Sequence, residues 1–203
     1  AEGTSIHWGV FGTNMNKDFR VENCRLNRID VHFHCWNLSI KDSHIGNKGI
    51  TLTGGGELVI ENTSCDTSRF VTFRRDFGAK WDGPVVIKNC RLRPYYSSKT
   101  AILSFVASDF DYGYPIGLAK SISVEDFVFD YRSVPSCKNR GWLIQSSPFS
   151  SYHNGERSFF PEFIRFRNIR VEGRSKGLHL MNLPAPGGFL LPKEGGSDGT
   201  FFK

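Results

Sequence analysis

An eight-residue pattern occurs six times in this 203-residue chain, and it constrains the fold more than any other feature of the sequence. Each copy reads apolar, any, apolar, charged, Asn or Asp, two variable residues, apolar. The copies are residues 19–26, 38–45, 58–65, 85–92, 122–129 and 164–171. The first three copies start 19 and 20 residues apart, and the later starts are 27, 37 and 42 residues apart. A repeat of about 20 residues with strand patterning is typical of a stacked solenoid.

Within each copy the apolar residues alternate with a period of two, so they share one face of a short strand. The Asn or Asp falls where this alternation breaks. Such residues tolerate a left-handed backbone and hydrogen-bond to nearby backbone groups, which makes them turn residues. If one coil stacks on the next at about 4.8 Å, these six residues form a ladder along one edge of the solenoid. They are Asn23, Asp42, Asn62, Asn89, Asp126 and Asn168.

A second apolar strand follows each copy of the pattern. These strands cover residues 29–33, 50–52, 71–73, 101–105, 142–144 and 178–180. Two strands at matched places in every repeat predict an all-β parallel β-helix of about six coils. A β-sandwich or jelly roll also contains many short strands at regular spacing. Neither of those folds predicts a turn Asn or Asp six times in register.

The six copies resemble the repeats of the right-handed parallel β-helix of the pectin-lyase-like superfamily, which includes pectate lyases, polygalacturonases and phage tailspikes. The resemblance covers about residues 18–183, and tracts 7–14 and 23–32 are similar to stretches of bacterial and phage β-helix proteins. It implies a right-handed single-stranded helix and a polysaccharide or oligosaccharide partner. It also implies a secreted or virion-associated location and, as in tailspikes, a homotrimer. The chain lacks a pectate-lyase calcium cluster and the polygalacturonase carboxylate motifs.

The spacing of the repeats also predicts how the chain is divided. Residues 1–17 form an N-terminal cap or partial coil, and residues 18–183 form the β-helix. Residues 184–203 are a Pro- and Gly-rich exit segment that we expect to continue into a further C-terminal part. The widening spacing places long loops on coils three to five. Loops of this length in a solenoid usually carry function.

The net charge of +6 suggests an anionic partner. Because the basic residues are spread over many coils, an acidic polysaccharide is a better candidate than a nucleic acid. No run of 18 apolar residues occurs, so we expect no membrane-spanning segment. The five cysteines include no CxxC pair, and Cys24 and Cys90 occupy the same position of the repeat. We therefore expect interior thiols, no disulfide framework, no zinc or other metal site, and no cofactor.

The second strand of each repeat predicts a stripe of polar side chains on the outer face. If Ile29, Val31 and Phe33 point inward, then Asp30, His32 and His34 point outward together. The stripe continues on later coils with Thr51, Thr53, Thr72, Arg74, Ser104, Gln145 and His179.

An acid beside a histidine suits proton abstraction, and an arginine suits a uronate carboxylate. Asp30, His32 and Arg74 are therefore the candidate catalytic residues, with Arg74 about 10 Å from the other two, at two coil spacings. His34 and Thr53 are candidate substrate contacts. A plain polar surface explains the same pattern.

The loops add aromatic and acidic residues suited to sugar recognition. The candidate substrate contacts there are Trp81, Asp109, Asp111, Tyr112 and Tyr114. Packing of these aromatic rings against the coil wall is the alternative. We predict a domain that binds an acidic polysaccharide, with degradation by lyase or glycoside hydrolase chemistry as an accompanying activity. A non-catalytic structural or adhesion module is the alternative function.

Overall fold

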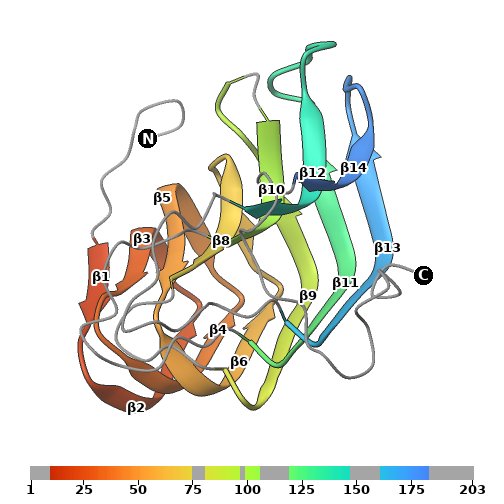
Figure 1. Cartoon of the computed structure of the whole chain (residues 1–203). Helices are drawn as coiled ribbons and strands as arrows, with labels where there is room; N and C mark the ends of the chain where they lie inside the picture. The colour runs from red at the N-terminus through yellow and green to blue at the C-terminus, as the bar shows by residue number, and fades with distance from the viewer. Residues whose placement is uncertain (1–9, 75–80, 97–98, 106–118, 147–160, 183–203) are drawn as a thin grey trace.

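The chain winds into successive coils that stack from one end of the molecule to the other (Figure 1). The computed structural model describes residues 10–74, 81–96, 99–105, 119–146 and 161–182. These residues contain fourteen strands and no helix. The strands are β1 Val10–Thr13, β2 Asn16–Glu22, β3 Arg25–Val31, β4 Cys35–Lys41, β5 His44–Leu52, β6 Gly54–Glu61, β7 Ser64–Cys65, β8 Arg69–Phe73, β9 Pro84–Leu92, β10 Lys99–Phe105, β11 Ser121–Asp130, β12 Arg140–Ser146, β13 Phe163–Glu172 and β14 Leu178–Asn182.

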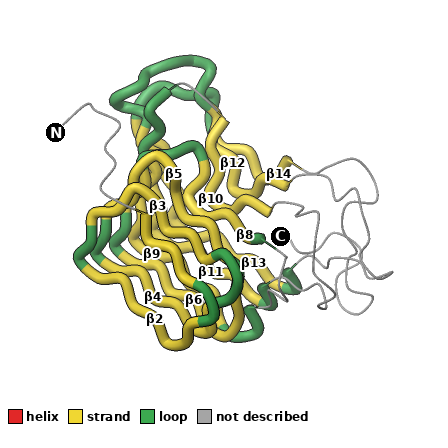
Figure 2. Tube along the Cα trace, turned by 90° about the vertical axis from the view of Figure 1, so that its left-hand side faces the viewer, coloured by secondary structure: helices red, strands yellow, loops and turns green. Residues whose placement is uncertain are grey.

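Every strand pairing among these residues is parallel, and each strand pairs with the strand one coil before or after it. One ribbon runs β2-β4-β6-β9-β11-β13, which are the strands that begin each repeat. A second ribbon runs β1-β3-β5-β8-β10-β12-β14. The short β7 bridges β5 and β9 between the two ribbons. Figure 2 shows the stacked coils side by side. The prediction of an all-β parallel β-helix is confirmed.

The six predicted turn residues all adopt the left-handed backbone. Their φ values lie between 49° and 54°. Their side chains also bond from coil to coil: Asn62 Nδ2 donates to Asp42 Oδ1 at 2.9 Å, and Asn89 Nδ2 donates to Asn62 Oδ1 at 2.8 Å. Asn168 Nδ2 donates to Asp126 Oδ1 at 2.6 Å. The predicted ladder is therefore present, and its bonds run in one direction, from Asn62, Asn89 and Asn168 back to the preceding coil.

A second, shorter ladder was not expected from the sequence. Asp18 and Asn37 have φ values of 54° and 58°, and Asn37 Nδ2 donates to Asp18 Oδ1 at 2.7 Å. At the same place in the next coil Gly56 has a φ of 69°. A Cβ on Gly56 would lie 2.2 Å from Asn37 Oδ1, so this position needs glycine for space as well as for conformation.

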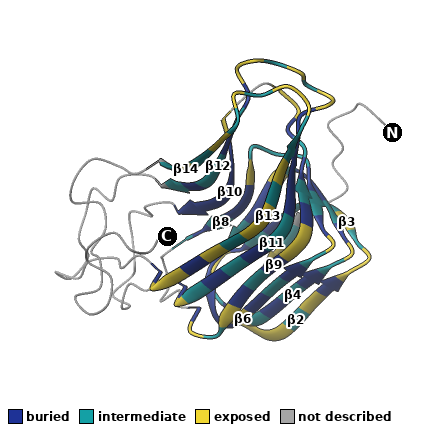
Figure 3. Cartoon of the chain, turned by 90° about the vertical axis from the view of Figure 1, so that its right-hand side faces the viewer, coloured by how far each residue is buried: buried dark blue, intermediate teal, exposed yellow. Residues whose placement is uncertain are grey.

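The core is the column of inward side chains enclosed by the coils. Buried and exposed residues alternate along the first ribbon (Figure 3), as the period-two pattern predicts. Five rows of inward residues stack in register, for example Leu38, Leu58, Val85 and Ile122, all at most 2% exposed. Phe73 stacks on Phe105 with ring centroids 5.5 Å apart. Because each row buries branched or aromatic side chains on their neighbours, hydrophobic burial holds the coils together.

The residue after each turn closes the bend with its own side chain in the first four coils. Ser43 Oγ and Thr63 Oγ1 donate to the backbone oxygens of Lys41 and Glu61, at 2.6 and 2.8 Å. The thiols of Cys24 and Cys90 do the same in their coils. Cys90 is buried and Cys24 is half-buried, and all five cysteines are free. Burial raises the pKa of the Cys90 thiol to about 12.

The last coil departs from the predicted register. Leu178 and Leu180 were expected inside, but they are 39% and 45% exposed. The strand pairing explains this, because Ile144 pairs with Met181, and Met181 is the residue that packs on the core. His179 was expected in the outward polar stripe beside Gln145. It pairs instead with Trp142 and stacks on that ring with centroids 4.6 Å apart.

Candidate functional site

The polar residues predicted for the stripe on the second ribbon pair in one row across five coils, although Ser104 in this row is buried, at 2% exposed. Asp30 pairs with Thr51, Thr51 with Thr72, Thr72 with Ser104, and Ser104 with Gln145. Asp30 Oδ2 forms an ion pair with Arg28 at 3.0 Å, and Asp30 Oδ1 is buried without a hydrogen-bond partner among the described residues. The acid of the predicted catalytic group is therefore held by its neighbour two residues earlier.

His32 and Arg74 lie on the same face and touch. Arg74 Nη1 is 3.2 Å from His32 Nδ1, where the sequence predicted a gap of about 10 Å between them. The long arginine side chain spans the intervening coil. Since a guanidinium only donates, this contact requires a lone pair on His32 Nδ1, so the proton of the neutral ring resides on Nε2. The pair forms a basic, hydrogen-bonding unit at the corner where the second ribbon ends.

Thr53 was predicted to contact substrate from the outer face, and the structure places it elsewhere. It follows β5 one coil before Arg74 and is 0% exposed. The next residue already begins β6, so the chain turns too tightly here to leave the side chain on the surface. A buried threonine cannot reach a ligand on the outer face, and this prediction is wrong.

His34 belongs to a cluster of aromatic rings at this same corner. His34 and Trp36 stack with centroids 6.3 Å apart, and His32 meets Phe33 edge-on at 5.1 Å. Phe33 and Trp36 are 39% and 41% exposed, although Phe33 was expected inside. The strand β3 ends at Val31, so the alternation that would have turned Phe33 inward stops before it. We call His32, Phe33, His34, Trp36 and Arg74 the aromatic corner.

A glycine allows the Trp36 ring to lie close to the coil surface. A Cβ at Gly56 would come within 3.1 Å of Trp36 Nε1 and Cε2. Trp36 itself pairs with Lys17 on one side and Gly55 on the other. Trp36 is not among the residues predicted from the sequence, and the signal that could have found it is a tryptophan placed one coil before a Gly-Gly-Gly run.

Trp81 was predicted to stack on a sugar ring from a loop, and this prediction is wrong. Its side chain is 1% exposed and belongs to the core. A Cβ on Gly54 would lie 2.7 Å from Trp81 Cη2, so the indole occupies the space that this glycine leaves open. The other predicted loop contacts, Asp109, Asp111, Tyr112 and Tyr114, lie outside the described residues.

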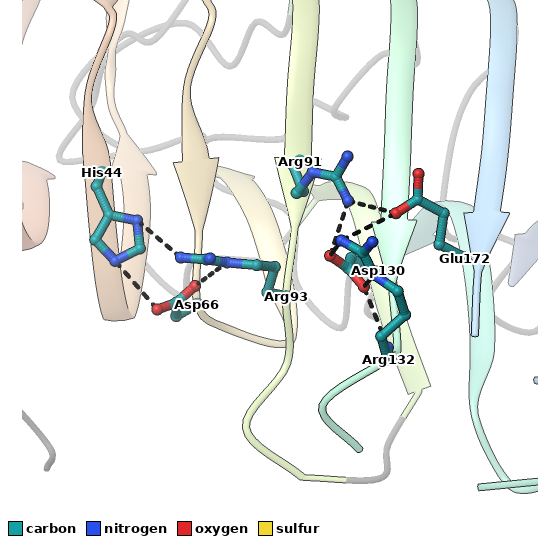
Figure 4. Close-up of polar contacts among 7 residues, drawn as sticks. All are labelled: His44, Asp66, Arg91, Arg93, Asp130, Arg132 and Glu172. Carbon is teal, nitrogen blue, oxygen red and sulfur yellow. Dashed lines mark hydrogen bonds and ion pairs between the residues drawn. The ribbon is translucent and has the colours of Figure 1, made fainter. Parts of the chain in front are cut away.

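A second polar cluster follows the turn ladder along the chain, and Figure 4 shows three of its members, His44, Asp66 and Arg93. His44 Nε2 is 3.1 Å from Asp66 Oδ2, and Arg93 Nε donates to Asp66 Oδ1 at 2.9 Å. His44 Nδ1 is 2.8 Å from Ser64 Oγ and 3.3 Å from Arg93 Nη2. The side chains of His44 and Asp66 are 14% and 16% exposed. Four residues from three successive coils thus form one connected network.

A third cluster lies beside the second one, two coils further along (Figure 4). Arg91 Nη1 contacts Asp130 Oδ2 at 2.8 Å and Glu172 Oε2 at 2.7 Å. Arg132 also binds Asp130, with Nη2 at 2.7 Å from Oδ2. Hydrogen bonds lower the pKa of Asp130 to about 2. The bond from Arg132 has the largest effect, and the bond from Arg91 adds to it. Arg91 therefore links its own coil to the two coils that follow.

Both clusters use the variable positions of the repeat, so the repeat pattern does not predict them. His44, Ser64 and Arg91 all occupy position seven of their copies, and Asp66 and Arg93 follow two residues later. Comparing position seven between neighbouring copies would have placed the histidine beside the serine. The part of the chain that the structure describes contains no cluster of His, Cys, Asp or Glu suited to a metal ion. It also contains no helix that could cross a membrane.

Comparison with known proteins gives one informative similarity. Over 94 residues the chain is 29% identical to a protein of Klebsiella phage P510 named as a depolymerase specific for the KL64 capsule. The match covers 40% of this chain and 9% of that protein. No family model matches the chain, and no solved structure matches it. The similarity joins the parallel β-helix as a second feature typical of tailspike-type proteins.

Proposed function

We propose that this chain binds an acidic polysaccharide at the aromatic corner. The observation that carries the proposal is the exposure of two large aromatic rings: Phe33, which meets His32 of the Arg74–His32 pair edge-on, and Trp36, which stacks on His34. Exposed aromatic side chains grouped on one surface mark interaction sites. An aromatic ring offers a flat apolar face to the C–H groups of a sugar, and an indole N–H adds a donor. Arg74 supplies the planar pair of donors that suits a carboxylate.

The similarity to a capsule depolymerase supports a bacterial capsule as the source of this polysaccharide. Because the match covers 9% of that protein, the ligand and activity of the whole relative remain proposals for this chain. The same similarity supports a place outside the bacterial cell, on a virion or as a secreted protein. A homotrimer, as the tailspike resemblance implies, would present three aromatic corners to one polymer and increase avidity.

Cleavage by Asp30, His32 and Arg74 is the stronger form of the proposal. In that form His32 abstracts a proton and Arg74 neutralises a uronate carboxylate. These contacts favour binding over cleavage, because Arg74 is hydrogen-bonded to His32 Nδ1 and Arg28 forms an ion pair with Asp30. A substrate carboxylate that draws Arg74 away would free His32 Nδ1 for proton transfer.

A glycan array of acidic and neutral capsule polysaccharides tests binding, with new reducing or unsaturated ends measured on the same samples. We expect Trp36→Ala to weaken binding at least tenfold, which corresponds to about 1.4 kcal/mol. Arg74→Ala should weaken acidic ligands more than neutral ones. Tyr96→Ala and Arg167→Ala are matched controls, because both remove exposed side chains of the same kinds outside the aromatic corner.

The outcome decides between the two forms of the proposal. Retention without new chain ends indicates a binding module, and His32→Ala should then change affinity alone. If the protein cleaves its ligand at this corner, His32→Ala should reduce turnover about a hundredfold or more, the scale of losing a general base. Equal binding by wild type, Trp36→Ala and Arg74→Ala would refute a site at the aromatic corner.

A further inference from the structure

The cluster of His44, Ser64 and Asp66 has the connectivity of a serine nucleophile with its base and orienting acid. His44 and Ser64 are directly paired across neighbouring coils. The serine oxygen is 2.8 Å from one ring nitrogen of His44, and the Asp66 carboxylate is 3.1 Å from the other. His44 and Ser64 occupy position seven of the repeat, which points outward, and Asp66 follows Ser64 by two residues (Figure 4 shows His44 and Asp66).

The chemistry of the partners decides the direction of the hydrogen bonds. An ionised carboxylate only accepts, so the proton of neutral His44 resides on Nε2 and points to Asp66. Nδ1 is then the acceptor with its single lone pair, and of its two neighbouring donors the Ser64 hydroxyl at 2.8 Å is nearer than Arg93 Nη2 at 3.3 Å. This order, hydroxyl to imidazole to carboxylate, is the one in which a histidine can take the proton of a serine nucleophile.

The surroundings hold this geometry in place. Arg93 Nε holds the second oxygen of Asp66 at 2.9 Å, and Arg93 Nη2 reaches the same His44 nitrogen as the serine. The backbone N–H of Ser64 donates to the Ser43 oxygen at 3.0 Å. The next side chain, Cys65, is fully buried and fixes the direction of the strand. The hydroxyl is therefore anchored on a rigid strand with a cationic group beside it.

The other coils show that stacking does not require a serine or a histidine at position seven. Coils one, four and six carry Arg25, Arg91 and Arg170 at position seven, and the coils stack without a serine or a histidine there. A hydroxyl bonded to a half-buried imidazole that is itself bonded to a carboxylate is thus an addition to the repeat. It occurs once among the described coils.

We propose that Ser64, His44 and Asp66 form an ester-hydrolysing centre separate from the aromatic corner. Ser64 Oγ attacks the acyl carbon of a carboxylic ester while its proton moves to His44 Nδ1, and the oxyanion that forms faces Arg93. The alcohol leaves with the proton from His44, and the acyl group stays on Ser64. Water, deprotonated by His44, then releases the carboxylic acid and restores the serine hydroxyl. Asp66 is a positioning residue, since it acts through His44.

An O-acyl group on a saccharide hydroxyl is the substrate class that fits best, and this part rests on the proposed function. Ser64 is partly exposed on the outer face of the coil wall, where a polymer can approach it. Removal of an acyl ester changes a polysaccharide without cutting its chain. The reaction therefore differs from the lyase and glycoside hydrolase chemistry considered for the aromatic corner.

The test uses small esters, so its result does not depend on polysaccharide binding. The purified protein is assayed with p-nitrophenyl acetate, and Ser64 is probed by a fluorophosphonate followed by peptide mass spectrometry. We expect labelling at Ser64 and a loss of at least about a hundredfold in hydrolysis for Ser64→Ala and His44→Gln. Ser39→Ala, which removes an outward serine from β4, should keep the wild-type rate.

Two further measurements separate catalysis from a structural role. Asp66→Asn should lower kcat while leaving KM within about twofold, because it misplaces the imidazole without touching the ester. Thermal unfolding of each variant shows whether the fold survives. If Ser64→Ala fails to fold, Ser64→Cys retains the side-chain size, and its rapid alkylation by iodoacetamide, abolished by His44→Gln, would support the same activation. Equal hydrolysis by wild type and Ser64→Ala with no label on Ser64 would overturn the proposal, even if glycan binding at the aromatic corner is found.

Discussion

Replacing Asn62 with Asp should break the turn ladder at one defined bond. Asn62 Nδ2 donates to Asp42 Oδ1 at 2.9 Å, and Asn62 Oδ1 accepts from Asn89 Nδ2 at 2.8 Å. An aspartate can still accept from Asn89 and tolerates the φ of 50°, but it cannot donate to Asp42. The lost bond costs about 0.5–1.5 kcal/mol. Two carboxylates about 4 Å apart in water add about 1 kcal/mol of repulsion.

The expected total of about 2 kcal/mol corresponds to a fall of about 4–8 °C in the unfolding midpoint for a domain of this size. Differential scanning calorimetry at pH 7 measures it, with Asn16→Asp as a control that adds the same charge at an exposed residue outside the ladder. The double variant Asp42→Asn with Asn62→Asp should recover most of the loss, because the amide at 42 can then donate to the carboxylate at 62. An Asn62→Asp midpoint equal to that of the control, or no rescue in the double variant, would refute the ladder as a source of stability.

Two other measurements follow from the described contacts. Asp130 has a pKa lowered to about 2 by Arg132 and Arg91, so its ionised form stabilises the fold above its unfolded pKa, and this stability is lost as the pH falls from about 4 to about 2. Since Arg132 is 64% exposed, we expect on the order of 1 kcal/mol, and Asp130→Asn should flatten the acid limb of a stability–pH curve. Cys137 is exposed and should react quickly with a thiol reagent at neutral pH, whereas Cys90, whose thiol is buried with a pKa of about 12, should react only on unfolding.

The parts of the fold that repeat could be predicted from the sequence. The turn residue, the strand before it and the inward rows depend on a local pattern, and the pattern recurs six times. Each copy faces the same requirements, namely an apolar side chain inside and a left-handed residue at the bend. Errors in one copy are corrected by the others, so Asn23 and Asn168 could be assigned with the same argument despite lying at opposite ends of the solenoid.

The parts that failed depend on where a strand stops, which alternation alone does not determine. Phe33 was extrapolated inward past the end of β3, and Thr53 was extrapolated outward past the end of β5. Both lie at the corner where the second ribbon passes into the next coil. Trp81 lies outside the strands as expected, but its side chain was expected to face a ligand, whereas it enters the core in the space left open by Gly54 one coil earlier.

The contacts of the candidate sites follow a rule that the stacking itself imposes. Residues at the same repeat position in neighbouring coils lie about 4.8 Å apart along the sheet, within reach of a direct side-chain hydrogen bond. Asn62 with Asp42 and Ser64 with His44 both obey it. Inward positions cannot vary without cost in packing, and the turn cannot vary beyond Asn, Asp or Gly. Functional side chains are therefore confined to the outward positions and the corners. A substitution at one such position changes the contact with the side chain on the neighbouring coil and leaves the fold largely unchanged. Substitutions of His44 and Ser64 at position seven should consequently change reactivity with little loss of stability, while those of the turn residues at position five should do the reverse.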